Sequence, residues 1–389
     1  MASPRLAPRR GPVTAAERSF APDLARGAML LLIALANSPL YLYGRPVGRR
    51  SHLAESGVLD RAVTFLVGTF VDGRAYPLFA FLLGYGIVRL ADRQVAAGAT
   101  IADVGAVLRR RHIALVAFGF LHALLLFSGD ILGTYGLAGL VVFTLLGASD
   151  RRLLALTAAL LVPVIALGTG YGLAPLPGDT GYPGMAVADP VGALLARLAN
   201  WLPATPISVL ATLAPIVLGV WAARRRLLDE PERHLAVLRR TTVVGITVAV
   251  LGGLPLALVM AGVWTSTSFA GDLTLGALHT LTGLAGGVGY AAAISLFAGG
   301  FRRRRIGAAL AACGQRSLSC YLAQSVVFVA VLAPYAGGLG GRLGSAGVAV
   351  VAIATWVATV VVAEVFQRHG WRGPAEVALR RLTYGRQPR

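Results

Sequence analysis

The chain has 389 residues, of which 56% are hydrophobic and only 14% are charged, and its formal net charge is +19. A soluble domain carries about 25% charged residues, so this composition excludes an ordinary soluble protein. All 36 basic residues are arginines, which stand in short clusters between apolar runs without a nucleic-acid-binding motif, so no nucleic-acid partner is expected. The composition predicts an all-α polytopic membrane protein.

The apolar runs predict the organisation of the chain. Residues 1–22 are rich in Arg, Pro and Ala and are expected to be a disordered basic tail. A single transmembrane domain follows over residues 23–366, and residues 367–389 form a basic C-terminal tail. Each predicted span is near the roughly 20 residues that a bilayer crossing needs. About ten spans are expected, over residues 24–43, 73–91, 110–127, 131–148, 152–173, 205–222, 241–262, 275–299, 317–335 and 345–366.

The arginines predict the orientation of these helices. With the N-terminus inside, the segments assigned to the cytoplasm hold 29 arginines and those assigned to the other side hold 7. Cytoplasmic connections carry an excess of Lys and Arg, so both termini are expected in the cytoplasm. The first external connection is an exception, because "YGRPVGRRSH" contains Arg45, Arg49 and Arg50. The arginine clusters also suit the anionic headgroups of membrane lipids.

Two stretches do not fit a simple spanning helix. Residues 58–72 are apolar but too short to cross, so they are expected to lie at the outer interface or to re-enter the membrane. Residues 174–204 contain many Pro and Gly and are expected to form the longest external loop. The end of that loop, "DPVGALLARLANWL", is a candidate interfacial helix.

The run "FLHALLLFSGDILGTYG" places two ionisable side chains in an apolar hairpin. Asp130 starts the second helix of the hairpin, where an aspartate commonly caps free backbone N–H groups. His122 lies inside a span, where a histidine needs a partner or a water-filled cavity. The alternative for His122 is a neutral imidazole that only hydrogen-bonds a neighbouring helix. The Ser128–Gly129 turn is expected at the outer surface.

Other polar residues are expected at the same depth as His122 and Asp130, and a polar cavity that opens outward would explain this. Gln324 instead belongs to a polar face in the inner half of the membrane. Cys313 and Cys320 show no metal-ligating spacing, and no metal is expected. The residues predicted to share the outer level are Asn37, Asp72, Arg74, Tyr135 and His279.

Several motifs together resemble one protein family. "PDLARGAMLLLIALAN", "GRAYPLFAFLLGYG", "GFLHALLLFSGDILGTYGLAGL", "GQRSLSCYLAQS" and "GPAEVALRRLTYG" are similar to blocks of the YeiB family, which shares the domain of unknown function 418. The resemblance covers nearly the whole chain, from about residue 22 to residue 386. It implies a multi-pass protein of the bacterial cytoplasmic (inner) membrane.

The YeiB family is distantly similar to transmembrane acyltransferases, which use an asparagine and a histidine to move an acyl group from cytosolic acyl-CoA to an acceptor on the far side. The resemblance implies acyl-CoA as a donor substrate, no permanently bound cofactor, and a small-molecule, glycan or lipid acceptor. Asn37 matches the asparagine. In the acyltransferases the histidine follows the asparagine by a shorter gap than His52 follows Asn37, so the functional histidine here is His122 or His52.

Three functions follow from these residues. In acyl transfer, His122 or His52 acts as general base, Asp130 orients the imidazole, and Asn37 or Arg74 stabilises the oxyanion. In proton-coupled transport, His122 and Asp130 form a proton relay. The third possibility is a non-catalytic protein that binds a lipid or a partner. The residues expected to bind the substrate are Asp72, Arg74, Tyr135, His279 and Gln324.

Overall fold

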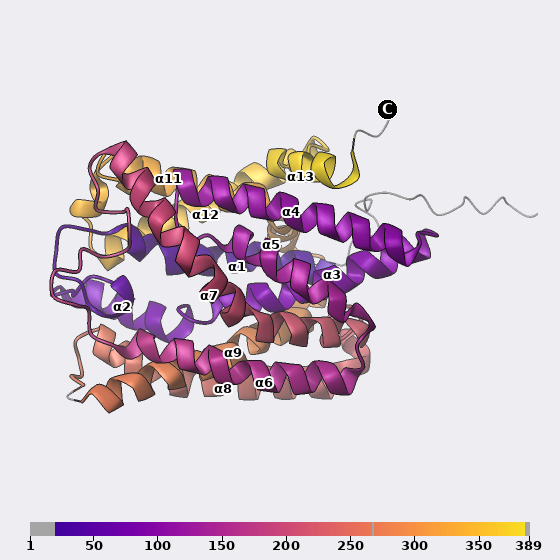
Figure 1. The fold of residues 1–389 in the computed structure, drawn as a ribbon, viewed down its shortest axis with the longest axis horizontal. Helices are drawn as coiled ribbons and strands as arrows, with labels where there is room; N and C mark the ends of the chain where they lie inside the picture. The colour runs from indigo at the N-terminus through magenta and orange to yellow at the C-terminus, as the bar shows by residue number, and fades with distance from the viewer. Residues whose placement is uncertain (1–19, 267, 386–389) are drawn as a thin grey trace, which may run out of the picture.

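The computed structural model describes residues 20–266 and 268–385 of the chain. Apart from one isolated bridge between Val47 and Leu53, the described residues form helices and loops (Figure 1). Short 3-10 turns extend α1 and α5 at their C-terminal ends. The helices are α1 (Phe20–Asn37), α2 (Val58–Phe70), α3 (Ala75–Ala96), α4 (Ile101–Leu125), α5 (Ile131–Val142), α6 (Asp150–Gly168), α7 (Pro190–Arg224), α8 (Leu235–Met260), α9 (Phe269–Phe301), α10 (Arg305–Gln315), α11 (Ser317–Leu332), α12 (Ser345–Arg368) and α13 (Pro374–Tyr384).

The predicted all-α membrane fold is confirmed. Among the described residues, seven helical segments are long and apolar enough to cross a membrane. The pair α10 and α11, bent by 84° at Arg316, makes an eighth if it is taken as one span. The other two predicted spans coincide with α4 and with the short apolar helix over Ile131–Gly147, and a total of ten spans stays a prediction. The disordered tail expected over residues 1–22 lies outside the described residues up to residue 19, and residues 20–22 begin α1.

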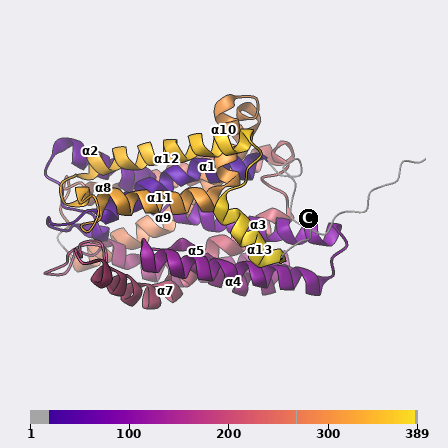
Figure 2. The same cartoon turned by 90° about the horizontal axis from the view of Figure 1, so that it is seen from above.

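Most of the helices lie along the long axis of the molecule, so that their connections gather at two ends (Figure 1). One end carries the connections with the arginine clusters, and α13 lies near it; we name it the arginine-rich end. The N-terminus of α2 lies at the opposite end. Figure 2 shows α4, α5 and α7 along one side of the bundle and α12 along the other.

The segment over residues 58–72 differs from its prediction. Its helix, α2, runs on into α3 through a break at Val71–Arg74, and together they form one segment of 39 residues. At the opposite end, Arg61 donates to the carbonyl oxygens of Ala261 and Gly262, directly after α8. The segment is therefore a broken span that enters between other helices, rather than an interfacial or re-entrant helix.

The break between α2 and α3 lies deep in the bundle, and Gly73 permits it there. Its φ of +74° is left-handed, a conformation that favours glycine, and a Cβ there would approach His279 Nε2 to 2.8 Å. Arg74 donates to the carbonyl oxygen of Ala249, eleven residues before the end of α8 at Met260. At 1.5 Å per residue this is about 16 Å inside the helix end, near the middle of a roughly 30 Å hydrocarbon core.

Helix α7 is also longer than predicted. The candidate interfacial helix "DPVGALLARLANWL" is the first part of α7, which continues for 35 residues to Arg224. It contains Pro203, Pro206 and Pro215, which membrane helices tolerate where neighbouring groups satisfy the freed carbonyls. The external loop therefore ends at Asp189, which caps α7, and not at residue 204.

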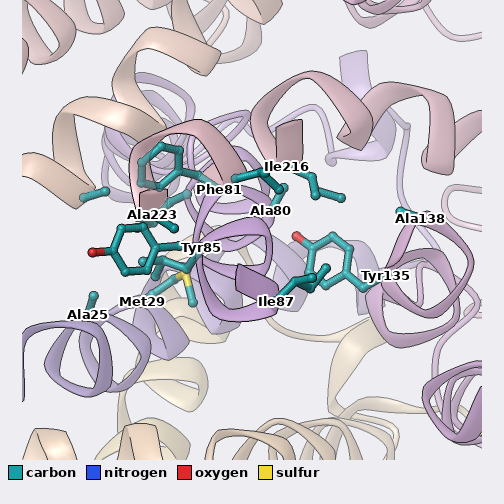
Figure 3. Close-up of a cluster of buried hydrophobic side chains, with 14 of the residues drawn as sticks. Ala25, Met29, Ala80, Phe81, Tyr85, Ile87, Tyr135, Ala138, Ile216 and Ala223 are labelled. Carbon is teal, nitrogen blue, oxygen red and sulfur yellow. The ribbon is translucent and has the colours of Figure 1, made fainter. Parts of the chain in front are cut away.

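The core is built around α3, whose side chains meet α1 on one side and α5 and α7 on others. Figure 3 shows Phe81 and Tyr85 of α3 near Met29, with Tyr135 beside the same helix. Gly84 permits a close approach of α3 to α7, because a Cβ there would collide with the backbone oxygen of Ile216 in α7. Across the same contact, a Cβ on Gly219 would collide with the oxygen of Phe81. Small residues that admit a neighbouring backbone are a common packing device in lipid.

We predict that Gly84→Ala destabilises the protein by about 1–3 kcal/mol, because α3 and α7 must separate to admit the methyl group. The measurement is thermal unfolding of the purified protein in detergent. Gly299→Ala is the matched control, since Gly299 lies in α9 with open space around it and gains about 0.5–1 kcal/mol of helix stability. Equal unfolding temperatures for the two variants would contradict the close contact between α3 and α7 at Gly84.

Candidate functional site

A cavity of about 250 Å³ with both polar and apolar residues in its wall lies between the α2–α3 break, α1, α7 and the α4–α5 hairpin. Its wall combines an amide, a guanidinium, two carboxylates and several hydroxyls with aromatic rings. Such a mixture suits a polar molecule with some apolar surface. The polar and aromatic residues of the wall are Asn37, Arg50, Asp72, Tyr76, Phe127, Ser128, Asp130, Thr134, Tyr171, Tyr182, Thr205, Ser208 and Thr212.

The carboxylate of Asp130 has two structural roles at the wall of this cavity. It caps α5, because its carboxylate accepts from the backbone N–H groups of Leu132 at 3.1 Å and Gly133 at 2.5 Å. The same carboxylate lies 2.9 Å from Nδ1 of His122, and neither side chain is exposed. The predicted cap and the predicted His122–Asp130 contact are both present, so the two interpretations of Asp130 are compatible.

The other nitrogen of His122 faces a third residue. Nε2 lies 2.8 Å from Oγ of Ser325 in α11, and Ser325 is buried. Since an ionised Asp130 can only accept, Nδ1 carries the proton, and Nε2 of a neutral imidazole then accepts from the serine hydroxyl. The ring also packs against Tyr321, with 4.9 Å between ring centroids. A hydroxyl, an imidazole and a carboxylate therefore stand in one hydrogen-bonded line.

The turn between α4 and α5 is buried within the protein, and its position at the outer surface of the membrane stays a prediction. Ser128 is only 3% exposed and accepts a hydrogen bond from Asn200 of α7 at 3.2 Å. Phe127 stacks on Tyr182 of the loop before α7, with 5.1 Å between ring centroids. Burial raises the pKa of Tyr182 to about 12. The loop therefore covers the hairpin and forms part of the cavity wall.

Asp72 anchors a second polar cluster at the break. Its carboxylate accepts two hydrogen bonds from Arg50, at 2.7 and 2.9 Å, and lies 3.4 Å from Nε2 of His52. Arg50 in turn lies over the ring of Tyr171, 4.0 Å from its centroid. Burial alone would lower the pKa of Arg50, but the adjacent Asp72 carboxylate raises it overall. This bidentate pair fixes a loop arginine at the cavity wall.

Arg74 lies behind the break and not on the cavity wall. It is fully buried and donates to the backbone oxygens of Asp72 and Ala249. Its NH1 also lies 3.0 Å from a ring nitrogen of His279, which is fully buried as well. Arg74 therefore ties together α3, α8 and α9 at mid-depth.

The structure brings together most of the predicted site residues. Asn37, Asp72 and Asp130 line the cavity, and His122, Arg74 and His279 lie directly behind residues of its wall. Tyr135 is not on the cavity wall: its ring lies in the core, and its hydroxyl donates to the backbone oxygen of Tyr76, a wall residue, at 3.0 Å. Gln324 is buried off the cavity, and its amide has no hydrogen-bond partner among the described residues.

Sequence reasoning missed Ser325 and Arg50. Ser325 ends the motif "GQRSLSCYLAQS", but the motif does not indicate its role, because a serine in a membrane helix commonly bonds only the backbone of its own helix. Arg50 did give a signal, as one of three arginines on the side where arginine is rare. Each of the three meets an acid: Arg45 with Glu55 at 3.4 Å, Arg49 with Asp272 at 2.8 Å, and Arg50 with Asp72.

Among the described residues, no three His, Cys, Asp or Glu side chains gather closely enough to hold a metal ion. The two clusters at the cavity, around Asp130 and around Asp72, are instead held by hydrogen bonds and ion pairs.

Comparison with known proteins supports the resemblance noted in the sequence. The model of a family described as "Protein of unknown function (DUF418)" matches residues 222–386. The uncharacterized protein YxaH of Bacillus subtilis (strain 168) is 24% identical over 402 aligned residues, which cover 96% of this chain and 96% of the relative. The alignment with YxaH spans both clusters of the cavity, and the DUF418 match includes Ser325 and His279.

We predict that Asp130→Ala destabilises the protein by about 2–4 kcal/mol. The cap accounts for about 0.5–2 kcal/mol, and the buried His122 N–H left without an acceptor for about 1–3 kcal/mol. Asp189→Ala is the matched control: Asp189 caps α7 through Gly192 but contacts no histidine, so only the cap is lost. Unfolding of both variants by heat in detergent provides the comparison. An Asp130 variant no less stable than the Asp189 variant would show that the carboxylate does not support His122.

Proposed function

We propose that this multi-pass membrane protein, which is similar to the DUF418 family and to YxaH, is a transmembrane acyltransferase of the bacterial cytoplasmic membrane. The observation that carries the proposal is the line Asp130–His122–Ser325 beside the polar cavity. Such a line supplies a general base whose orientation is fixed before any substrate arrives.

The chemistry needs a base of the correct tautomer. Asp130 holds the proton on Nδ1, so Nε2, which accepts a hydrogen bond from the Ser325 hydroxyl, is the nitrogen that can take a proton from a hydroxyl. A carboxylate in this position also stabilises the imidazolium that forms during the reaction. The buried setting strengthens both effects, because water does not compete for the imidazole.

The cavity supplies the remaining parts. Asn37 and Arg50 stand on its wall and are the candidates to bind a carbonyl oxygen as it gains negative charge. Arg74 was also predicted to stabilise the oxyanion, but its guanidinium already contacts backbone oxygens and His279 behind the break. The acceptor would be a small molecule, glycan or lipid that presents a hydroxyl or an amine in the cavity.

The donor would approach from the other side. In this proposal the arginine-rich end faces the cytoplasm, as the positive-inside rule favours for connections that carry arginine clusters. An acyl-CoA-like donor carries phosphates, for which arginine is a strong partner. In this proposal acyl-CoA is a substrate and no cofactor stays bound.

A proton-coupled transporter is the second candidate, and the broken span over residues 58–96 favours it. Discontinuous helices with charged residues near the middle of the membrane are typical of transporters. Asp72 and Arg74 stand at this break beside the cavity. Uptake of a solute into proteoliposomes that follows an imposed proton gradient, without a covalent product, would favour transport over acyl transfer.

We predict that His122→Ala lowers the rate of acyl transfer by about 10²–10⁴-fold, the usual contribution of a general base. The assay measures thiol release from acetyl-CoA or palmitoyl-CoA by protein in lipid nanodiscs, with and without hydroxyl- and amine-bearing acceptors. His112→Ala is the control, since His112 is another buried histidine of α4 whose Nδ1 meets only the backbone oxygen of Leu108. A wild-type rate for His122→Ala in correctly inserted protein would remove His122 from the mechanism.

A further inference from the structure

Ser325 occupies the side of the His122 ring that lies away from Asp130. Its Oγ contacts Nε2 at 2.8 Å, while Asp130 contacts Nδ1 at 2.9 Å. Asp130 belongs to the cavity wall and Ser325 does not. Ser325 therefore lies beyond the imidazole from the cavity wall, and an acceptor in the cavity has to reach past the His122 ring to attack an acyl group on Ser325 Oγ.

Two buried side chains of this region, Gln324 and Tyr41, have polar atoms without a hydrogen-bond partner among the described residues. Gln324, the preceding residue, is 2% exposed, and neither its amide oxygen nor its amide nitrogen has a hydrogen-bond partner among the described residues. The hydroxyl of Tyr41 also faces Ser325. Buried polar groups are nearly always paired, so the unpaired Tyr41 hydroxyl that faces Ser325 indicates that a polar group binds there. The carbonyl of an acyl group is of this kind, because it accepts hydrogen bonds from an amide or a hydroxyl.

Acyl transfer across a membrane has to bring together a donor from one side and an acceptor from the other. Helix α11 begins at Ser317, next to the bend at Arg316 toward the arginine-rich end. Ser325 lies eight residues further along, about 12 Å into the bundle at 1.5 Å per residue. It is thus placed between the side proposed for the donor and the cavity proposed for the acceptor.

We propose that Ser325 is the nucleophile of the reaction and carries the acyl group as an ester between the two substrates; this rests on the proposed acyltransferase function. In the first step the bond between Ser325 Oγ and the acyl carbon forms as the thioester C–S bond breaks. The hydroxyl proton passes to Nε2 of His122 and then to the departing thiolate, which leaves as a thiol. In the second step the acceptor's hydroxyl or amine attacks the ester. The C–Oγ bond breaks, and the acceptor's proton returns through His122 to Ser325.

The experiment is acyl labelling of the full-length protein in nanodiscs with [¹⁴C]acetyl-CoA and, separately, [¹⁴C]palmitoyl-CoA, without acceptor, followed by acid quench and mass spectrometry. We expect label on the peptide that contains Ser325, and its loss in Ser325→Ala and in His122→Ala. Ser325→Cys should restore labelling as a thioester that neutral hydroxylamine releases, which also shows that the site is folded. Ser295→Ala is the control, since this buried serine of α9 bonds only the backbone oxygen of Leu228 and should leave labelling unchanged.

The outcomes separate the inference from the function on which it rests. Acyl transfer by Ser325→Ala at the wild-type rate, with no label on the wild-type protein, overturns the role of Ser325 and leaves the acyltransferase standing. A fall in transfer of about 10³-fold or more in Ser325→Ala, together with labelling at Ser325, supports the inference. If the wild-type protein neither takes label nor releases thiol with either donor and any acceptor, the proposed function itself fails.

Discussion

The contact between Asp130 and His122 is the interaction on which the candidate site depends. Either side chain alone would be costly inside a membrane, where an ionisable group needs a partner. Together with two backbone N–H groups of α5, the pair satisfies the carboxylate and fixes the imidazole. The same contact ties the end of α4 to the start of α5, so the hairpin and the position of the site arise from one interaction. Because the ring is held through Nδ1, its Nε2 is left for Ser325.

A second constraint is the pairing of charges at the end opposite the arginine clusters. Arginines there run against the orientation rule, and Arg45, Arg49 and Arg50 each meet a carboxylate. The pair of Arg50 and Asp72 joins the loop after α1 to the α2–α3 break, while Arg74 joins the break to α8 and α9. The cavity is thereby bounded by elements that are fixed by charge on one side and by the hairpin on the other. A binding site on such a frame needs little rearrangement when a ligand enters.

Much of the fold could be predicted from hydropathy and arginine positions, because apolar runs of membrane length have few alternatives to a helix. Every predicted span coincides with a helix, and the contact of His122 with Asp130 follows from their spacing across a short turn. The break at Gly73 was missed because its cause is a backbone conformation and a close approach of His279, neither of which changes hydropathy. The many Pro and Gly residues over 174–204 suggested a loop up to residue 204, but α7 already begins at Pro190 and continues through Pro203. The role of Ser325 could not be predicted, because it depends on the packing of α11 against His122 of α4.

The most direct test of this account is the position of the proton on the His122 ring. It can be measured by ¹H–¹⁵N NMR of the protein in nanodiscs with ¹⁵N-labelled histidine rings, with the His122 signal assigned from its loss in His122→Gln. The account predicts a proton on Nδ1, shifted strongly downfield by the Asp130 carboxylate, an unprotonated Nε2, and loss of the downfield signal in Asp130→Asn. A proton on Nε2, or a signal unchanged in Asp130→Asn, would contradict the proposed line from Asp130 through His122 to Ser325.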